Sequence, residues 1–290
     1  MPEVIDGHLH LFRSHSDRYP RTVYDVMAEA EREELAEKLL ASMESAGVDH
    51  AVVVPLSKED DYLREVLTSF PGRFAGVGIF EHERPDDVAS LEGRLAATDL
   101  QGLRFYGLAA DESSTIQTLT SFPTFELMAE RGMVVWFYGD VIQLRLMDQV
   151  MRRLPDLKVV LNHSAFLPDM HAEMQMDDHR RPHFDVELPP SGLPIVESLA
   201  AEHGNLHVHF SGHYAFSAEP YPYRDLEEVG QRLLAAFGAN RMIMASDWPW
   251  IEFEPGYARI LGVVDELLPG LTPAERDSIR GGTAASLFRF

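Results

Sequence analysis

Short and nearly continuous apolar runs recur along the chain, and they predict the strands of a parallel sheet. Each run is rich in Val, Ile, Leu, Met and Phe and lacks polar alternation, as expected of strands that are buried on both faces. The predicted strands are Val4–Leu9, His50–Pro55, Phe74–Phe80, Gly102–Tyr106, Met133–Tyr138, Lys158–His163, Leu206–Ser211 and Arg241–Asp247.

Segments with helical periodicity follow most of these runs. Leu35, Leu39 and Met43 recur at helical spacing, and Gly47 predicts the end of that helix. Further helices are predicted after Pro85-Asp86-Asp87, from Pro123 to Gly132, and over Leu144–Leu154, Pro194–His203, Leu226–Phe237, Tyr257–Leu268 and Pro273–Phe290. Eight strands that alternate with helices predict an α/β protein with a (β/α)8 TIM barrel, here a single domain over residues 1–290 that its C-terminal tail closes. A doubly wound open sheet is the alternative.

One connection, between His163 and Leu206, is long, polar and poorly periodic. Its central part runs from Pro168 to Gly192 and is rich in His, Asp and Arg. A loop of this length often serves as a lid, and a surface insertion without order is the alternative.

The charge balance limits the partners of the protein. The chain has 47 acidic and 25 basic residues, a formal net charge of −22, which argues against nucleic acid or an anionic membrane as partner. A small anionic substrate would need a local cationic site. No apolar run approaches the roughly 20 residues of a membrane-spanning helix. Because no charged and apolar leader precedes the first strand, we expect a cytoplasmic protein; a homo-oligomer stays open.

A pair of histidines marks the end of the first predicted strand. In the motif Asp6-Gly7-His8-Leu9-His10, side chains alternate between the two faces, so His8 and His10 point the same way and could share a metal ion. With 13 histidines in the chain such a pair also arises by chance, and His207 and His209 form a second one. The position of the first pair adds weight, because TIM-barrel chemistry is located at the C-terminal ends of the strands.

His163 and Asp247 lie at the ends of two further strands. A histidine in such a place can also be a hydrogen-bonded core residue, and an aspartate there can be a helix cap. However, a carboxylate at the end of a buried strand is costly unless it is paired or binds metal. Together with the first histidine pair, these residues would form a mononuclear site suited to Zn²⁺ or a similar divalent ion.

Several motifs, in their order along the chain, resemble the amidohydrolase-2 family of metal-dependent hydrolases. They are most similar to its lactonase branch, which includes 2-pyrone-4,6-dicarboxylate, sugar-acid and sulfomuconolactone lactonases. The motifs are Ile5-Asp6-Gly7-His8-Leu9-His10, Ala46-Gly47-Val48-Asp49, Gly102-Leu103-Arg104, Asn162-His163, Val208-His209-Phe210-Ser211-Gly212 and Ala245-Ser246-Asp247-Trp248-Pro249. The resemblance implies a TIM barrel, a divalent metal held by His8, His10, His163 and Asp247, and Asp247 as general base.

The resemblance also implies residues that contact the substrate. Arg104 is expected to hold a substrate carboxylate, since a guanidinium forms a bidentate fork with carboxylates; a salt bridge at the barrel mouth is the alternative. Tyr106 and Tyr138 end the fourth and fifth strands and are candidates for donors to the substrate, or for packing residues. His213 stands where a histidine acts as acid and base in the decarboxylase branch of the family.

The sequence is compatible with three functions. The first is a hydrolase that opens a carboxylate-bearing lactone with metal-activated water. The second is a metal-dependent non-oxidative decarboxylase of the same family, which His213 favours. The third is a non-catalytic barrel that serves as a binding or scaffold protein. The arginine strand and the Ser246-Asp247-Trp248-Pro249 ending favour the lactonase.

Overall fold

Eight parallel strands form the main sheet of the described chain, in the order β1-β2-β3-β4-β5-β6-β9-β10. The computed structural model describes residues 2–166 and 174–290. The strands of the main sheet are β1 (Ile5–His10), β2 (His50–Val54), β3 (Phe74–Phe80), β4 (Leu100–Tyr106), β5 (Val134–Tyr138), β6 (Lys158–Leu161), β9 (Leu206–Phe210) and β10 (Met242–Met244). All eight predicted strands are confirmed, with ends that move by a few residues.

The sheet closes on itself where the last strand returns to the first. Leu9 and Trp248 form a parallel bridge just beyond β10. The backbone N–H of His10 donates to the carbonyl of Trp248 over 2.8 Å, and that of Asp247 donates to the carbonyl of His8 over 3.0 Å. The fold is therefore a (β/α)8 TIM barrel, and the open-sheet alternative is wrong.

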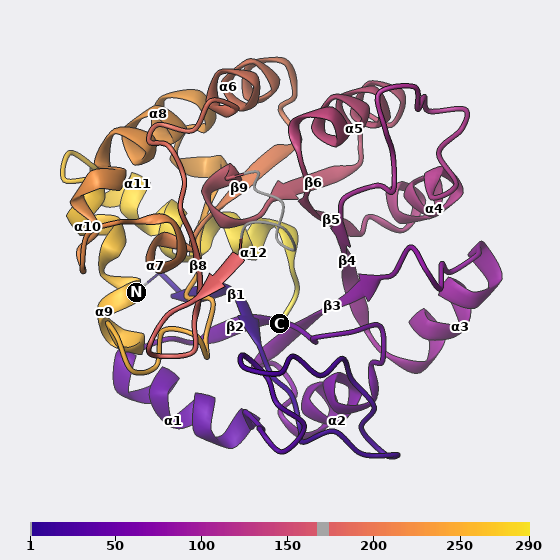
Figure 1. Ribbon diagram of the computed structural model, residues 1–290, viewed down its shortest axis with the longest axis horizontal. Coiled ribbons are helices and arrows are strands. Elements are labelled where there is room, and N and C mark those ends of the chain that lie inside the picture. Colours follow the sequence, from indigo (N-terminus) through magenta and orange to yellow (C-terminus); the bar gives the residue numbers. More distant parts are fainter. Residues whose placement is uncertain (1, 167–173) are drawn as a thin grey trace.

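Helices surround the barrel, as Figure 1 shows. Their bounds are α1 (Ala36–Ala46), α2 (Asp61–Ser69), α3 (Val88–Ala97), α4 (Phe122–Arg131), α5 (Val141–Arg153), α6 (Leu193–Glu202), α7 (His213–Phe216), α8 (Glu227–Phe237), α9 (Tyr257–Leu261), α10 (Val263–Leu267), α11 (Pro273–Asp277) and α12 (Thr283–Leu287). Short 3₁₀ turns lie at His163–Ala165, Arg224–Leu226 and Ala239–Arg241, and a π turn lies at Ser278–Gly282.

Most helices lie where the periodicity predicts them. Gly47 and Gly132 end α1 and α4 in the left-handed conformation, at φ of 70° and 66°, which glycine adopts without steric cost. Helix α2 is absent from the predicted set. The last two predicted helices are divided: Gly262 separates α9 from α10, and the π turn separates α11 from α12.

The C-terminal tail fills one end of the barrel, as predicted. Ala284, Leu287 and Phe288 belong to the same buried cluster as side chains from inside the barrel, among them Ile5 and Trp136. The ring of Phe288 meets that of Trp136 edge to face, with centroids 6.3 Å apart. The functional site therefore has to lie toward the other end of the barrel.

The long loop contains a small hairpin that the sequence pattern does not predict. Antiparallel strands β7 (Met174–Met176) and β8 (Pro182–Phe184) lie within the segment from Pro168 to Gly192. Residues 168–173 of that segment are outside the described residues. Within the described part, no helix has the length and apolar character needed to cross a membrane.

Candidate functional site

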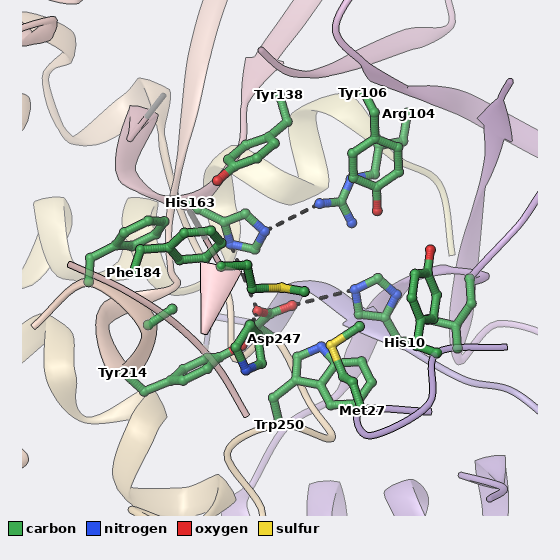
Figure 2. A pocket seen from close by; sticks show the side chains of 16 residues that line it. His10, Met27, Arg104, Tyr106, Tyr138, His163, Phe184, Tyr214, Asp247 and Trp250 are labelled. Atoms are coloured by element: carbon green, nitrogen blue, oxygen red, sulfur yellow. Dashed lines mark hydrogen bonds and ion pairs between the residues drawn. The ribbon is translucent and has the colours of Figure 1, made fainter. Parts of the chain in front are cut away.

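A pocket of about 220 Å³ opens at the C-terminal ends of the strands. Its walls are largely aromatic and aliphatic, and several of the predicted site residues reach its floor (Figure 2). The lining residues are His10, Tyr24, Met27, Leu56, Arg104, Tyr106, Tyr138, His163, Met174, Pro182, Phe184, Tyr214, Ala215, Phe216, Asp247 and Trp250. A mainly apolar cavity with a few convergent polar groups is typical of a small-molecule site.

Three predicted metal ligands meet at this pocket, which His10 and Asp247 line and His8 adjoins. His8 and His10 point to the same side of β1, and Asp247 reaches them across the barrel closure. Asp247 Oδ1 lies 3.7 Å from His8 Nε2 and 3.5 Å from His10 Nε2, longer than an ordinary hydrogen bond. Ligands held about 2.1 Å from a tetrahedral ion stand about 3.4 Å apart, so this spacing fits a divalent metal.

His163 lies beside this group rather than within it. Its Nδ1 is 3.9 Å from Asp247 Oδ2, and its Nε2 is 3.3 Å from Arg104 Nη2. Figure 2 shows the imidazole between the two side chains. Of the four predicted ligands, all of which lie in the described chain, three have their ligand atoms within 4.8 Å of one another. These three are His8, His10 and Asp247.

The chain leaves its strands early at both His163 and Asp247. Strand β6 ends at Leu161 and β10 ends at Met244, before the ends that the apolar runs predict. His163 and Asp247 have positive φ values of 49° and 59°, a conformation that few side chains adopt and that breaks the strand. Such backbone geometry is concentrated at functional sites, where it directs side chains toward the ligand.

The imidazoles of the site are held neutral. Burial lowers the pKa of His8 well below its usual value, and the cation of Arg104 lowers it further. Burial also lowers the pKa of His10, and it lowers the pKa of His163 to about 4. A neutral imidazole keeps a lone pair for a metal ion or a hydrogen-bond donor.

The Asp247 carboxylate is held as an anion. Burial alone would raise its pKa, but His163, His10 and the Tyr214 hydroxyl outweigh burial and hold the pKa below its usual range. The hydroxyl of Tyr214 donates to Asp247 Oδ2 over 2.7 Å. Tyr214 is a site residue that the sequence does not predict, although it follows the predicted residue His213 directly.

Arg104 is buried at the floor of the pocket. Its Nη1 lies 3.2 Å from His8 Nε2, and its guanidinium stacks on the ring of Tyr106 at 4.4 Å. Tyr106 and Tyr138 both line the pocket, at the ends of β4 and β5. The geometry therefore brings all three predicted substrate-binding residues to one cavity.

A second carboxylate supports the site from below. Asp6 is fully buried and accepts hydrogen bonds from the backbone N–H of Ser246 at 2.8 Å and from the Tyr257 hydroxyl at 3.0 Å. Burial raises its pKa to about 6 against these hydrogen bonds. Because Asp6 and Ser246 flank the site from β1 and from the segment after β10, this contact fixes the two sides of the barrel closure.

The predicted residue His213 and the nearby His209 lie outside the pocket lining. His209 is fully buried inside the barrel, where it stacks on His8 at 5.4 Å and meets Trp136 edge to face at 4.6 Å. His213 is buried between Phe210 and Tyr223, with ring centroids 4.4 and 6.3 Å away. Neither ring is among the side chains that line the described cavity.

The hairpin, the loop after β1, α7 and the segment after β10 all contribute to the apolar wall, which the sequence does not predict. Phe184 of β8 stacks on Phe216 at 5.2 Å, and Trp250 lies 5.9 Å from His10. Arg180 pairs with Glu29, and Arg181 pairs with Glu254 over 3.1 Å, so that ion pairs join the hairpin to both neighbouring loops. These contacts arise between distant loops, where no strand or helix pattern reveals them.

The family model described as "Amidohydrolase" matches residues 5–290. The chain belongs to the amidohydrolase family. It is therefore a hydrolase, and members of this family typically use a divalent metal.

Individual relatives agree with this assignment. The amidohydrolase is 28% identical over 261 residues to the L-fucono-1,5-lactonase of Burkholderia ambifaria, a match over 84% of this chain and 80% of that protein. Its fold matches that of a putative 2-pyrone-4,6-dicarboxylic acid hydrolase from Pseudomonas putida, with a TM-score of 0.75, 22% identity, and coverage of 99% and 98%. It also matches an amidohydrolase from Burkholderia multivorans with bound zinc, with a TM-score of 0.70, 21% identity, and 98% coverage of both chains.

Proposed function

We propose that this amidohydrolase opens a lactone that carries a carboxylate, with Asp247 as general base and zinc as the metal. The observation that carries the proposal is the meeting of Asp247 with His8 and His10, because His10 and Asp247 line the same pocket as Arg104. A lactonase relative at 28% identity supports the same reaction class. His8, His10 and Asp247 would hold the ion, with His163 beside them.

A divalent ion at this place supplies a Lewis acid that polarises a carbonyl and lowers the pKa of water. Arg104 binds the substrate carboxylate and orients the ring. Asp247 accepts a proton from the attacking water, whose oxygen adds to the lactone carbonyl carbon. The bond from that carbon to the ring oxygen then breaks, and Asp247 returns the proton to the leaving oxygen, which gives a hydroxy acid. Tyr214 holds the carboxylate in place throughout.

The decarboxylase alternative depends on His213, which lies outside the pocket lining. Nothing in the described geometry favours it over ring opening.

The test is a panel of lactones with and without a carboxylate, incubated with the zinc-loaded protein while acid release is recorded. We expect turnover of carboxylated lactones and at least a hundredfold loss in the Asp247→Asn variant, since general base catalysis contributes about 10²–10⁴-fold. Release of carbon dioxide from aromatic acids, with no lactone opened, would overturn the proposal in favour of the decarboxylase.

A further inference from the structure

The guanidinium of Arg104 contacts His8 Nε2, the same atom that would bind the metal ion. Arg104 Nη1 lies 3.2 Å from that nitrogen, and Arg104 Nη2 lies 3.3 Å from His163 Nε2. Because a guanidinium can only donate, each imidazole must accept with its Nε2 lone pair. His8 Nε2 is also the atom that faces Asp247 Oδ1 at 3.7 Å in the group of metal ligands.

Two physical effects set the Arg104 guanidinium against the ion. One lone pair on His8 Nε2 cannot serve an N–H donor and a metal at once. In addition, a fixed positive charge beside a divalent cation is repulsive, and burial strengthens the repulsion because little water screens it. Arg104 is 1% exposed and His8 is fully buried. The arginine therefore weakens binding of the metal as long as it stays on His8.

A carboxylate offers Arg104 a better partner than a neutral imidazole. A guanidinium and a carboxylate form two parallel charge-assisted hydrogen bonds, which are about twice as strong as neutral ones. Arg104 lines the pocket, and its Nε has no hydrogen-bond partner among the described residues. Its stacking on Tyr106 keeps the guanidinium beside the cavity, as Figure 2 shows. A carboxylate in the cavity also cancels the charge that repels the ion.

We propose that a carboxylate ligand and a divalent ion bind to this amidohydrolase with positive coupling, because the ligand draws Arg104 away from His8 Nε2 and neutralises its charge. The inference rests on the proposed function, since it uses the same metal site and the same arginine. Coupling is reciprocal, so the carboxylate tightens binding of the ion by the same factor by which the ion tightens binding of the carboxylate.

The test measures zinc binding rather than turnover. Metal-free full-length protein is titrated with Zn²⁺ against a chromophoric chelator, alone, with benzoate, and with benzamide. Benzoate presents a carboxylate on a flat ring that suits the aromatic walls, and benzamide has the same shape without the charge. We expect benzoate to tighten zinc binding at least about fivefold, the lower end of usual coupling between sites, and benzamide to change it less than twofold.

Two variants identify the cause. Arg104→Met should bind zinc more tightly than the wild type without ligand, and benzoate should add nothing. Arg181→Met removes a different cation, which lies over the ring of Tyr214 at 5.6 Å and is hydrogen-bonded to Asp177 and Glu254 rather than to the imidazoles, so the coupling should persist. Coupling that persists in Arg104→Met would mean that benzoate binds the zinc directly, and the proposal would fail.

The outcomes also separate this inference from the proposed function. Equal zinc affinity of the wild type with and without benzoate would overturn the coupling, and this measurement needs no variant to fold. The proposed lactone opening would be unaffected by that result, because a separate assay tests it. Absence of zinc binding in every mixture would overturn the metal site itself, and the coupling with it.

Discussion

The two oxygens of Asp247 have different partners. This division fits the two roles proposed for the carboxylate, metal ligand and general base. Oδ2 accepts the Tyr214 hydroxyl, while Oδ1 faces the imidazoles of His8 and His10. The common orientation of His8 and His10 can be predicted from sequence, because strand alternation puts both side chains on one side of β1. Tyr214 cannot be predicted in this way, because it lies in the short helix α7, and no periodic pattern relates α7 to the segment after β10.

Loss of the Tyr214 hydroxyl should change the titration of Asp247. A hydrogen bond to the charged form lowers a carboxyl pKa, so Tyr214→Phe should raise the pKa of Asp247 and move the acid limb of the kcat/KM profile to higher pH. We also expect kcat/KM to fall about 10- to 100-fold, the range for a hydrogen bond to a charged group. The pH–rate profile of the zinc-loaded enzyme measures both effects.

Tyr223→Phe provides the matched control for this prediction. The Tyr223 side chain is buried nearby, but its hydroxyl has no hydrogen-bond partner among the described residues. Its removal should leave the acid limb where it is. An acid limb that stays in place in Tyr214→Phe would show that Tyr214 only fills space.

At the scale of elements, buried strands are the most predictable part of this protein. All eight are nearly continuous apolar runs, because helices cover one side of the sheet and side chains fill the interior of the barrel. Helix α2 is short, and its buried face consists of Tyr62, Leu63 and Val66. The hairpin strands β7 and β8 have three residues each, too few to show a period. Strands as short as these are therefore identified by their tertiary contacts alone.

The C-terminal tail should contribute a large share of the stability of the barrel. Phe288 is 3% exposed and packs against Trp136, so Phe288→Ala should lower the free energy of unfolding by about 3–5 kcal/mol, the cost of a cavity at a buried phenylalanine. Urea unfolding followed by tryptophan fluorescence measures the change. Phe253→Ala is the control, because Phe253 is 74% exposed and should change stability by less than about 0.5 kcal/mol. Equal effects of the two substitutions would contradict the sealing role of the tail.

At the scale of the whole molecule, the buried histidines make stability depend on pH. Burial lowers the pKa of His207 to about 4 and that of His213 to about 3. The unfolded chain binds protons at these groups below their usual pKa near 6.5, while the folded protein does not, so stability falls as pH falls from about 6.5 to 4. Asp6 acts in the opposite direction, because its pKa is raised to about 6 in the folded protein and it holds a proton that the unfolded chain has released.

We expect the histidines to outweigh Asp6, with a net loss of a few kcal/mol on acidification, because one pKa unit corresponds to about 1.36 kcal/mol. Urea midpoints at several pH values between about 4.5 and 7 measure this loss. His213→Gln cannot take up the proton, so its midpoint should fall less steeply with acidification. A wild-type slope in that variant would mean that other groups control acid unfolding.

The contact between the first strand and the segment after the last one has a consequence for biosynthesis. His8 and His10 leave the ribosome well before Tyr214 and Asp247 do. The contacts that hold Asp247, which are the hydrogen bond from the Tyr214 hydroxyl and that from its own N–H to the carbonyl of His8, can therefore form only late in synthesis. A chain that is still growing, or that ends before residue 247, therefore contains the imidazoles of His8 and His10 but lacks the Asp247 carboxylate. If Asp247 is the base, as proposed above, hydrolytic activity should therefore arise in one late step, when β10 docks against β1.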